Sequence, residues 1–401
     1  MLYTVPPDLN LNDRAPPMMQ SRILPFIAIV LSAANLALAQ TKPRARDLGV
    51  PFDGIPGPYN AITDVKGVEV GHTTLISGSG KLKVGEGPVR TGVTAVLPRG
   101  KDSLDPVFGA WFTLNGNGEM TGTTWLEDSG FLEGPVMITN THSVGVVRDA
   151  VIAWRIKKAP PDSEGYSWSL PVVAETADDD LNDMNGFHVK PEHAFHALDT
   201  ARGGPVEEGN VGGGTGMICN EFKGGIGTSS RVLPTRLGGY TIGVLVQCNY
   251  GWRSQLRIAG VPVGQEIPDH TVRNEDIGSI IIVIATDAPL IPTQLKRLAR
   301  RAALGLGRDG SFSGDGSGDI FIAFSTANPG AADATGVRDL KMLPNQKINP
   351  IFLATVQATE EAVVNAMVAA ETMTGINDYT VYALPHDRLR EVLKKYNRLA
   401  K

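Results

Sequence analysis

The stretch EDIGSIIIVIATDAPL, residues 275–290, decides the fold because it contains an unbroken apolar run. Ile280 to Ala285 carries no polar side chain, which predicts a strand buried in the core. The pair Gly278-Ser279 stands directly before this run. Taken alone, the pair is best interpreted as a turn that precedes a core strand. The functional question is what else a serine at the start of a buried strand could do.

The composition predicts a globular protein with a full hydrophobic core. The chain has 401 residues, of which 42% are hydrophobic and 20% charged, enough for one large domain or two medium ones. The net charge is −5 and no long basic run occurs, which argues against nucleic acid as the main partner. The 46 glycines cluster between apolar runs, which is typical of many short strands joined by tight turns.

The N-terminal region has the pattern of an export signal. Arg22 provides a basic start, Ile23–Ala34 is apolar, and Ala37-Leu38-Ala39 is a small-x-small cleavage site. The apolar stretch is too short for a membrane-spanning helix, and the alternative is a buried helix. We therefore expect residues 1–39 to be a signal peptide with an upstream extension. The mature protein is then periplasmic and has no membrane partner.

The two cysteines, Cys219 and Cys248, each end an apolar run and each precede an asparagine. Two cysteines are too few for a disulfide framework. We expect both to be free thiols in the core. A single buried bridge stays open as the alternative if the protein is exported.

Apolar segments of strand and helix periodicity are interleaved without a regular βαβ alternation. This order predicts an α+β layered sandwich with sheets in the middle and helices outside. Strands are expected at 91–100, 108–122, 169–179, 240–251, 280–285 and 319–328. Helices are expected at 143–158, 190–201, 292–307, 359–375 and 386–401.

Motifs for metals, nucleotides and the common serine hydrolases are weak or missing. The seven histidines form no HExxH, and the spacing of His193 and His196 is more typical of a helix surface than of a zinc site. The segment GNVGGGTG, residues 209–216, lacks the GK[ST] ending of a phosphate loop and precedes a strand instead of a helix. No G-x-S-x-G is present. We therefore predict no metal and no cofactor.

A different chemistry would suit Ser279. A serine hydroxyl is a poor nucleophile until a base removes its proton, and the α-amino group of the same residue, with a pKa of about 7.7–8.0, could be that base. This requires cleavage of the Gly278–Ser279 bond, for which self-cleavage through the serine hydroxyl is the economical route. A glycine before the bond allows a strained peptide and does not crowd the attacked carbonyl.

The segment GSIIIVIATDAPL resembles the cleavage-site signature of the self-processing L-aminopeptidase D-esterase/amidase family, which includes the β-peptidyl aminopeptidases. Other blocks of the mature chain also resemble the family and occur in the order that the family has. Among them are RTGVTAV, NGNGEMTG, LPVVAET, EGNVGGGTGMIC, GVLVQCNYG and SGDIFIAFSTANP. The resemblance implies a four-layer αββα sandwich of the N-terminal-nucleophile hydrolase kind. It implies one domain cut into a large subunit, 40–278, and a small subunit, 279–401. It also implies an oligomer of such heterodimers.

The resemblance also implies the roles of five residues. Ser279 matches the nucleophile, and the side-chain amide of Asn249 matches an oxyanion donor. Ser317 and Asp319 match a second serine and an acidic residue that could relay a proton beside the nucleophile. Glu175 matches the carboxylate that binds the free ammonium group of the substrate.

The chain departs from the family pattern directly after Glu175-Thr176. Relatives carry an aromatic-Asp-Gly sequence there, whereas this chain has Ala177 followed by three aspartates, Asp178 to Asp180. An aromatic hydroxyl that assists the oxyanion in some members is therefore absent. This leaves open the preference for α- or β-amino acids and for L- or D-substrates.

We thus expect a serine aminopeptidase acting on short peptides, amides and esters through an acyl-Ser279 intermediate. One alternative is an acyltransferase resembling ornithine acetyltransferase, although that enzyme uses threonine at the cleaved position. Another is an amidase or esterase of the same fold. A third alternative, from a different class, is a periplasmic binding protein whose glycine loops hold a ligand.

Overall fold

The computed structural model describes residues 42–158, 168–272 and 277–400. From Lys42 onward these residues form one compact unit. The predicted signal peptide and upstream extension, residues 1–39, lie outside the described residues, so the export signal stays a prediction.

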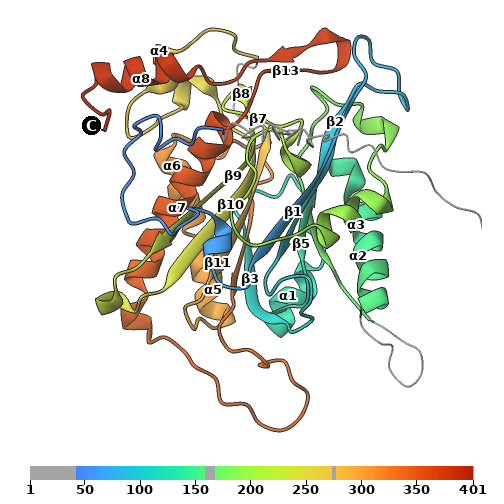
Figure 1. Ribbon diagram of the computed structural model, residues 1–401, viewed down its shortest axis with the longest axis vertical. Coiled ribbons are helices and arrows are strands. Elements are labelled where there is room, and N and C mark those ends of the chain that lie inside the picture. Colours follow the sequence, from blue (N-terminus) through green and yellow to red (C-terminus); the bar gives the residue numbers. More distant parts are fainter. Residues whose placement is uncertain (1–41, 159–167, 273–276, 401) are drawn as a thin grey trace, which may run out of the picture. The chain divides into compact units, whose positions relative to one another are not determined.

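The larger sheet has six strands in the order β4-β3-β12-β11-β10-β9. The predicted core strand is β11, Ser279–Thr286, and every residue in it is buried. It pairs antiparallel with β10 and parallel with β12, so it lies inside the sheet (Figure 1). The other strands are β3 (Val107–Thr113), β4 (Phe131–Leu132), β9 (Gly225–Val232), β10 (Thr241–Asn249) and β12 (Ile320–Ser325).

The smaller sheet has four strands in the order β1-β2-β5-β6, and it packs face to face with the larger one. The alternation of side chains along β11 shows this arrangement. Ile281 and Val283 contact the core between the two sheets, whereas Ile280 and Ile282 point to the opposite face, where helices cover the sheet. The strands are β1 (Glu69–Ser77), β2 (Val89–Leu97), β5 (Val136–Thr139) and β6 (Val172–Glu175).

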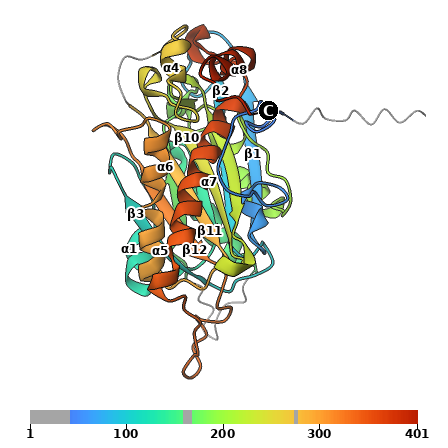
Figure 2. The same cartoon turned by 90° about the vertical axis from the view of Figure 1, so that its left-hand side faces the viewer.

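Helices cover the outer face of each sheet, which confirms the predicted αββα sandwich. On the smaller sheet these are α2 (Val144–Lys158) and α3 (Pro191–Asp199). On the larger sheet they are α5 (Pro292–Ala299) and α7 (Asn349–Val368), while α6 (Ala302–Arg308) packs on α7. In Figure 2, α6 lies above α5, and both run alongside α7. By length and composition α7 could cross a membrane, but 83% of its most apolar window is buried inside the protein.

Two helix predictions need correction. The single helix expected over 292–307 is divided into α5 and α6. The Arg301 N–H bonds to the carbonyl of Leu298, three residues back, so the chain tightens into a 3₁₀-type turn at the junction. Helix α7 begins at Asn349, well before the predicted start near Thr359, with a proline in its first turn.

The remaining α-helices and strands are α1 (Thr123–Ser129), β7 (Ile218–Cys219), β8 (Phe222–Lys223), α4 (Val263–Glu266), β13 (Met373–Thr374), β14 (Thr380–Val381) and α8 (His386–Lys395).

The expectation of two free thiols is wrong. Cys219 on β7 and Cys248 on β10 form a disulfide, with their Cα atoms 5.5 Å apart. Both residues are fully buried. The two cysteines meet because the β7–β8 hairpin folds back against the end of β10. The spacing of the cysteines along the chain does not reveal this contact.

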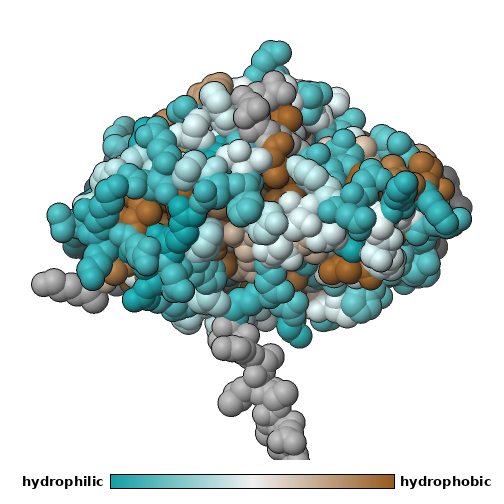
Figure 3. Space-filling view, turned by 90° about the horizontal axis from the view of Figure 1, so that it is seen from above, coloured by the Kyte–Doolittle hydropathy of each residue, from teal (hydrophilic) through white to brown (hydrophobic). Residues whose placement is uncertain are grey.

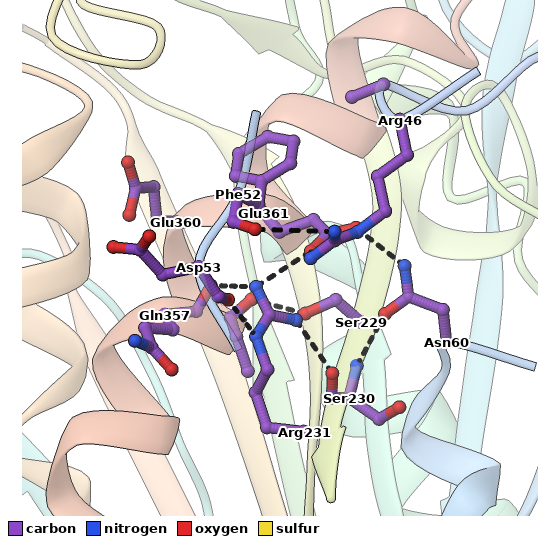
Figure 4. Close-up of polar contacts among 12 residues, drawn as sticks. Arg46, Phe52, Asp53, Asn60, Ser229, Ser230, Arg231, Gln357, Glu360 and Glu361 are labelled. Carbon is purple, nitrogen blue, oxygen red and sulfur yellow. Dashed lines mark hydrogen bonds and ion pairs between the residues drawn. The ribbon is translucent and has the colours of Figure 1, made fainter. Parts of the chain in front are cut away.

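A buried ionic cluster joins α7, β9 and the first residues of the compact unit (Figure 4). The Glu361 carboxylate is fully buried and lies 2.8 Å from guanidinium nitrogens of both Arg46 and Arg231. The side-chain amide of Asn60 donates to it at 2.6 Å. Burial alone would raise the pKa of Glu361, but the hydrogen bonds and the charges of the two arginines hold it below its usual value.

We predict that Glu361→Ala lowers the free energy of unfolding by about 3–5 kcal/mol, because Arg231 is then buried without its counter-charge. Urea unfolding at pH 7 measures this. The matched control is Glu371→Ala, which removes an exposed ion pair with Lys42 and should cost at most about 1 kcal/mol. Equal losses in the two variants would contradict the prediction.

The stabilising effect of Glu361 depends on pH, and the direction follows from its lowered pKa. Because the pKa of Glu361 is lowered on folding, its stabilising effect is complete above its ordinary value of 4.5 and is lost as the pH falls below that value. The deficit of Glu361→Ala should therefore shrink in acid.

Candidate active site

Ser279 occupies the first position of β11, opposite Asn249, the last residue of β10. Its side chain is almost buried, with 9% of the residue exposed, and the backbone N–H of Gly318 donates to its hydroxyl oxygen at 2.9 Å. The preceding Gly278 has φ +97°, and a Cβ atom there would lie 2.0 Å from the carbonyl oxygen of Asn249. This backbone therefore requires glycine at position 278.

The structure places Ser317 and Asp319 on either side of Gly318, whose backbone bonds to Ser279. The Ser317 hydroxyl donates to a carboxylate oxygen of Asp319 at 3.0 Å, and both residues are buried. Gly318, which bonds to Ser279, lies between them in the chain. The Ser317–Asp319 pair is thus linked to Ser279 through the backbone of Gly318, where β11 and β12 begin.

Asn115 belongs to this group and was missed by the sequence analysis. Its side-chain amide donates to the Ser317 hydroxyl at 2.8 Å and also lies within hydrogen-bond distance of the carbonyls of Ser313 and Gly314. A hydroxyl that accepts from Asn115 must turn its own proton away, toward Asp319 or the Gly314 carbonyl. The only signal was the position of Asn115 in the block NGNGEMTG, to which no role was assigned.

The side-chain amide of Asn249 is held in one orientation. Its Oδ1 accepts a hydrogen bond from the backbone N–H of Ile218 at 2.8 Å, which places Nδ2 on the other side of the amide group. Nδ2 donates to the carbonyl of Ala177 at 2.8 Å. An amide nitrogen carries two hydrogens, so one N–H is used by Ala177 and the second can serve the pocket beside Ser279.

Ser279, Asn249 and Glu175 line one pocket of about 460 Å³. Its described lining includes four carboxylates and neither lysine nor arginine, which favours a ligand with a positive charge. The face of the molecule seen from above is mainly hydrophilic, with small separate hydrophobic patches (Figure 3). Among the described residues, the lining comprises Asn117, Gly118, Glu119, Thr141, Glu175, Ala177, Asp179, Asp180, Asn249, Ile277, Gly278, Ser279 and Gly316.

Glu175, at the end of β6, is the most buried of these carboxylates, with 4% of the residue exposed. One oxygen accepts the backbone N–H of Glu119 at 2.8 Å, and the other accepts the hydroxyl of Thr141. Burial raises the pKa of Glu175, and these two hydrogen bonds offset only part of the effect. A bound ammonium group would supply the missing counter-charge.

The three aspartates that follow Ala177 do not share one role. Asp178 is buried, and its carboxylate accepts hydrogen bonds from the amides of Asn140 and Asn182. Burial raises the pKa of Asp178 to about 6 despite these bonds. Only Asp179 and Asp180 line the pocket, so they alone extend its acidic character.

The other motifs have structural roles. Gly213 and Gly214 lie in a short helical turn packed tightly against both sheets, where a Cβ atom would meet Gln247 or the backbone of Ile226. His193 accepts the backbone N–H of Lys190 at the start of α3. In the parts of the chain that the structure describes, no group of three or more His, Cys, Asp or Glu could hold a metal ion.

Comparisons with known proteins agree with this geometry. Residues 60–381 match the model of peptidase family S58. The β-peptidyl aminopeptidase BapA of Sphingosinicella microcystinivorans is 57% identical over 94% of this chain and 98% of its own. The corresponding enzyme of Sphingosinicella xenopeptidilytica is 50% identical over 93% of this chain and 96% of its own.

Solved structures show the same relationship. The L-aminopeptidase D-Ala-esterase/amidase of Ochrobactrum anthropi, described as a prototype of the serine aminopeptidases and a variant of the Ntn hydrolase fold, superposes with a TM-score of 0.83. It is 51% identical and covers 90% of this chain and 100% of its own. A β-aminopeptidase from a Burkholderia species is 46% identical, with a TM-score of 0.80, over 88% of this chain and 99% of its own. The chain therefore belongs to peptidase family S58 and is a serine aminopeptidase.

Proposed function

We propose that this enzyme cleaves itself between Gly278 and Ser279 and then removes β-amino acyl or small L-α-amino acyl residues from short peptides, amides and esters. The observation that carries this proposal is the shared pocket of Ser279, Asn249 and Glu175. It combines a nucleophile, an amide donor and a carboxylate for the substrate amine. The names of the Sphingosinicella and Burkholderia relatives favour β-amino acyl substrates.

Self-cleavage needs no other reactant than water. The Ser279 hydroxyl attacks the carbonyl carbon of Gly278, the peptide C–N bond breaks, and the nitrogen becomes the free α-amine of Ser279. Water then hydrolyses the resulting ester, so that Gly278 gains a carboxylate and Ser279 regains its hydroxyl. Gly278 adopts a positive φ of +97° and has no Cβ to crowd the carbonyl that is attacked.

The two chains would stay together after the cut. Strands β11 and β12 of the small subunit lie between β10 and β3 of the large subunit, with continuous pairing on both sides. The carboxylate of Glu361, in the small subunit, binds Arg46 and Arg231 of the large one. Separation would break both the sheet and a buried ionic cluster.

In the catalytic cycle, Glu175 binds the ammonium group of the substrate. This contact fixes how far from the amino end of the substrate the scissile carbonyl must lie. The Ser279 α-amine takes the proton of its own hydroxyl, whose oxygen attacks that carbonyl. The free N–H of Asn249 stabilises the oxyanion. The leaving amine receives the proton, and water releases the acyl group from Ser279. Ser317, oriented by Asp319, passes protons between the α-amine and the reacting groups.

The cellular setting is part of the proposal. The Cys219–Cys248 disulfide supports export to the periplasm, because disulfides form and persist mainly in oxidising compartments. We also propose that the cleaved heterodimers assemble into a homo-oligomer. Light scattering of the purified enzyme tests this assembly, and a mass of one heterodimer would contradict it.

Ser279→Ala should give a folded, uncut and inactive chain, because the variant lacks the hydroxyl that attacks Gly278. A denaturing gel should show two bands for the wild type and one for the variant, with N-terminal sequencing placing the cut at Ser279. Circular dichroism controls for folding. A variant that is still cut or active would show that the nucleophile lies elsewhere, and an uncut but active wild type would contradict self-processing.

Glu175→Gln should raise KM for a β-alanyl anilide by about thirtyfold or more, which corresponds to the loss of about 2 kcal/mol from a buried charge pair. Because burial raises the pKa of Glu175, kcat/KM of the wild type should fall in acid at a higher pH than for an ordinary carboxyl, as the protonated group no longer attracts ammonium. The glutamine variant should lack this transition. An unchanged KM would remove Glu175 from substrate binding.

Asn115→Ala should lower kcat by about tenfold and leave KM unchanged, because the Ser317 hydroxyl loses the donor that directs its proton, while general acid–base steps contribute about 10²–10⁴-fold. The control is Asn328→Ala, which removes an exposed amide bonded to the Lys341 carbonyl. Equal kcat values for the two variants would assign Asn115 a purely structural role.

A further inference from the structure

A small hairpin covers the end of β10 next to the active site. Its strands are β7 and β8, and the turn residues Asn220 and Glu221 both have positive φ, 49° and 60°, as in the tight turns of two-residue hairpins. The backbone N–H of Asn220 donates to the Tyr250 carbonyl at 2.6 Å. The hairpin is thus held directly against the chain that follows Asn249.

One backbone group of this hairpin is one of two partners that orient the Asn249 amide, the other being the Ala177 carbonyl. The Ile218 N–H donates to Oδ1 of Asn249 at 2.8 Å, so Nδ2 must lie on the opposite side. Without this donor only the bond from Nδ2 to the Ala177 carbonyl would hold the amide, which could then rotate about that bond. The second N–H would move out of line with the oxyanion that it is proposed to stabilise.

The disulfide lies beside this hydrogen bond. Cys219 follows Ile218 in the chain, and Cys248 precedes Asn249, so the covalent link and the hydrogen bond join the same two segments one residue apart. Both sulfurs belong to fully buried residues. The disulfide therefore limits how far the Ile218 N–H can move away from Oδ1.

Other contacts hold both ends of the hairpin. At the turn, the Arg253 guanidinium donates to the carbonyls of Asn220 and Glu221, and its Cζ atom lies 3.2 Å from the centre of the Phe222 ring. At the open end, the buried Lys223 ammonium donates to the carbonyls of Met217 and Gly224. Loss of the disulfide should therefore shift the Ile218 N–H relative to Asn249 without detaching the hairpin.

We propose that the Cys219–Cys248 disulfide is a positioning element of the Asn249 amide and that full turnover requires it. The inference rests on the proposed role of Asn249. When the disulfide forms, the two thiols give two electrons and two protons to a disulfide oxidant, which is reduced to two thiols. Newly made protein with free thiols would then turn over slowly until it is oxidised.

The test uses Cys219→Ala/Cys248→Ala in the full chain, with kcat and KM measured at 25 °C on the cleaved enzyme. We expect kcat to fall about tenfold, part of the roughly 10²–10³-fold loss expected when an oxyanion donor is removed. KM should change less than about twofold, because Glu175 is not affected. The matched control is Leu295→Ala, a fully buried residue of α5 that should lower the melting temperature and preserve kcat.

Asn249→Ala separates positioning from general stability. If the disulfide acts through Asn249, the cysteine substitutions should cause little further loss of kcat in the Asn249→Ala background. Independent, multiplicative losses would overturn this inference alone, as would a wild-type kcat in the double cysteine variant. A wild-type kcat in Asn249→Ala would instead overturn the proposed role of Asn249 and the inference with it.

A second measurement avoids substitutions, in case the cysteine variant does not fold. Wild-type protein isolated from a reducing cytosol, with its free thiols counted, is assayed before and after oxidation by glutathione disulfide. We expect kcat to rise about tenfold as the two thiols disappear. Equal kcat values for the thiol and disulfide forms would overturn the inference.

Discussion

The register of β10 against β11 is the constraint on which the active site depends. It places Asn249 opposite Ser279, and continuous pairing along eight residue pairs fixes this alignment. Because side chains alternate between the faces of a strand, a slip of one residue would exchange Ile281 and Val283 in the core between the sheets with residues that face the helices. Hydrophobic packing far from the site thus fixes the position of Ser279 relative to Asn249.

Buried hydrogen bonds position the other polar side chains of the site. Each of these side chains has a partner that cannot be recognised from the spacing of residues along the chain. Glu175 is fixed by Thr141 and by the backbone of Glu119, and Asn249 by the backbone of Ile218. Groups taken out of water keep the orientation that satisfies their hydrogen bonds, because an unsatisfied buried donor or acceptor is costly. The pocket is therefore preorganised before substrate binds.

The sequence could predict the layers of the fold, since the apolar run of β11 and the periodicity of α2 and α3 reflect local burial. The family resemblance points to Ser317 and Asp319, and the structure places both directly before β12. The sequence could not predict Asn115 or the Cys219–Cys248 bridge. Both depend on contacts between segments that only the packed sheets bring together, and no local pattern records them.

These contacts would also make the proposed cut at the start of a central strand compatible with a stable enzyme. Breaking the chain before Ser279 removes one covalent bond but leaves β11 paired on both sides and Glu361 bound to Arg46 and Arg231. The proposed cut would place the α-amine of Ser279, a residue only 9% exposed, at the wall of the pocket. Burial there would favour the neutral amine, and nearby carboxylates would favour its charged form. The same packing that holds the fragments together would therefore tune the base that the nucleophile requires.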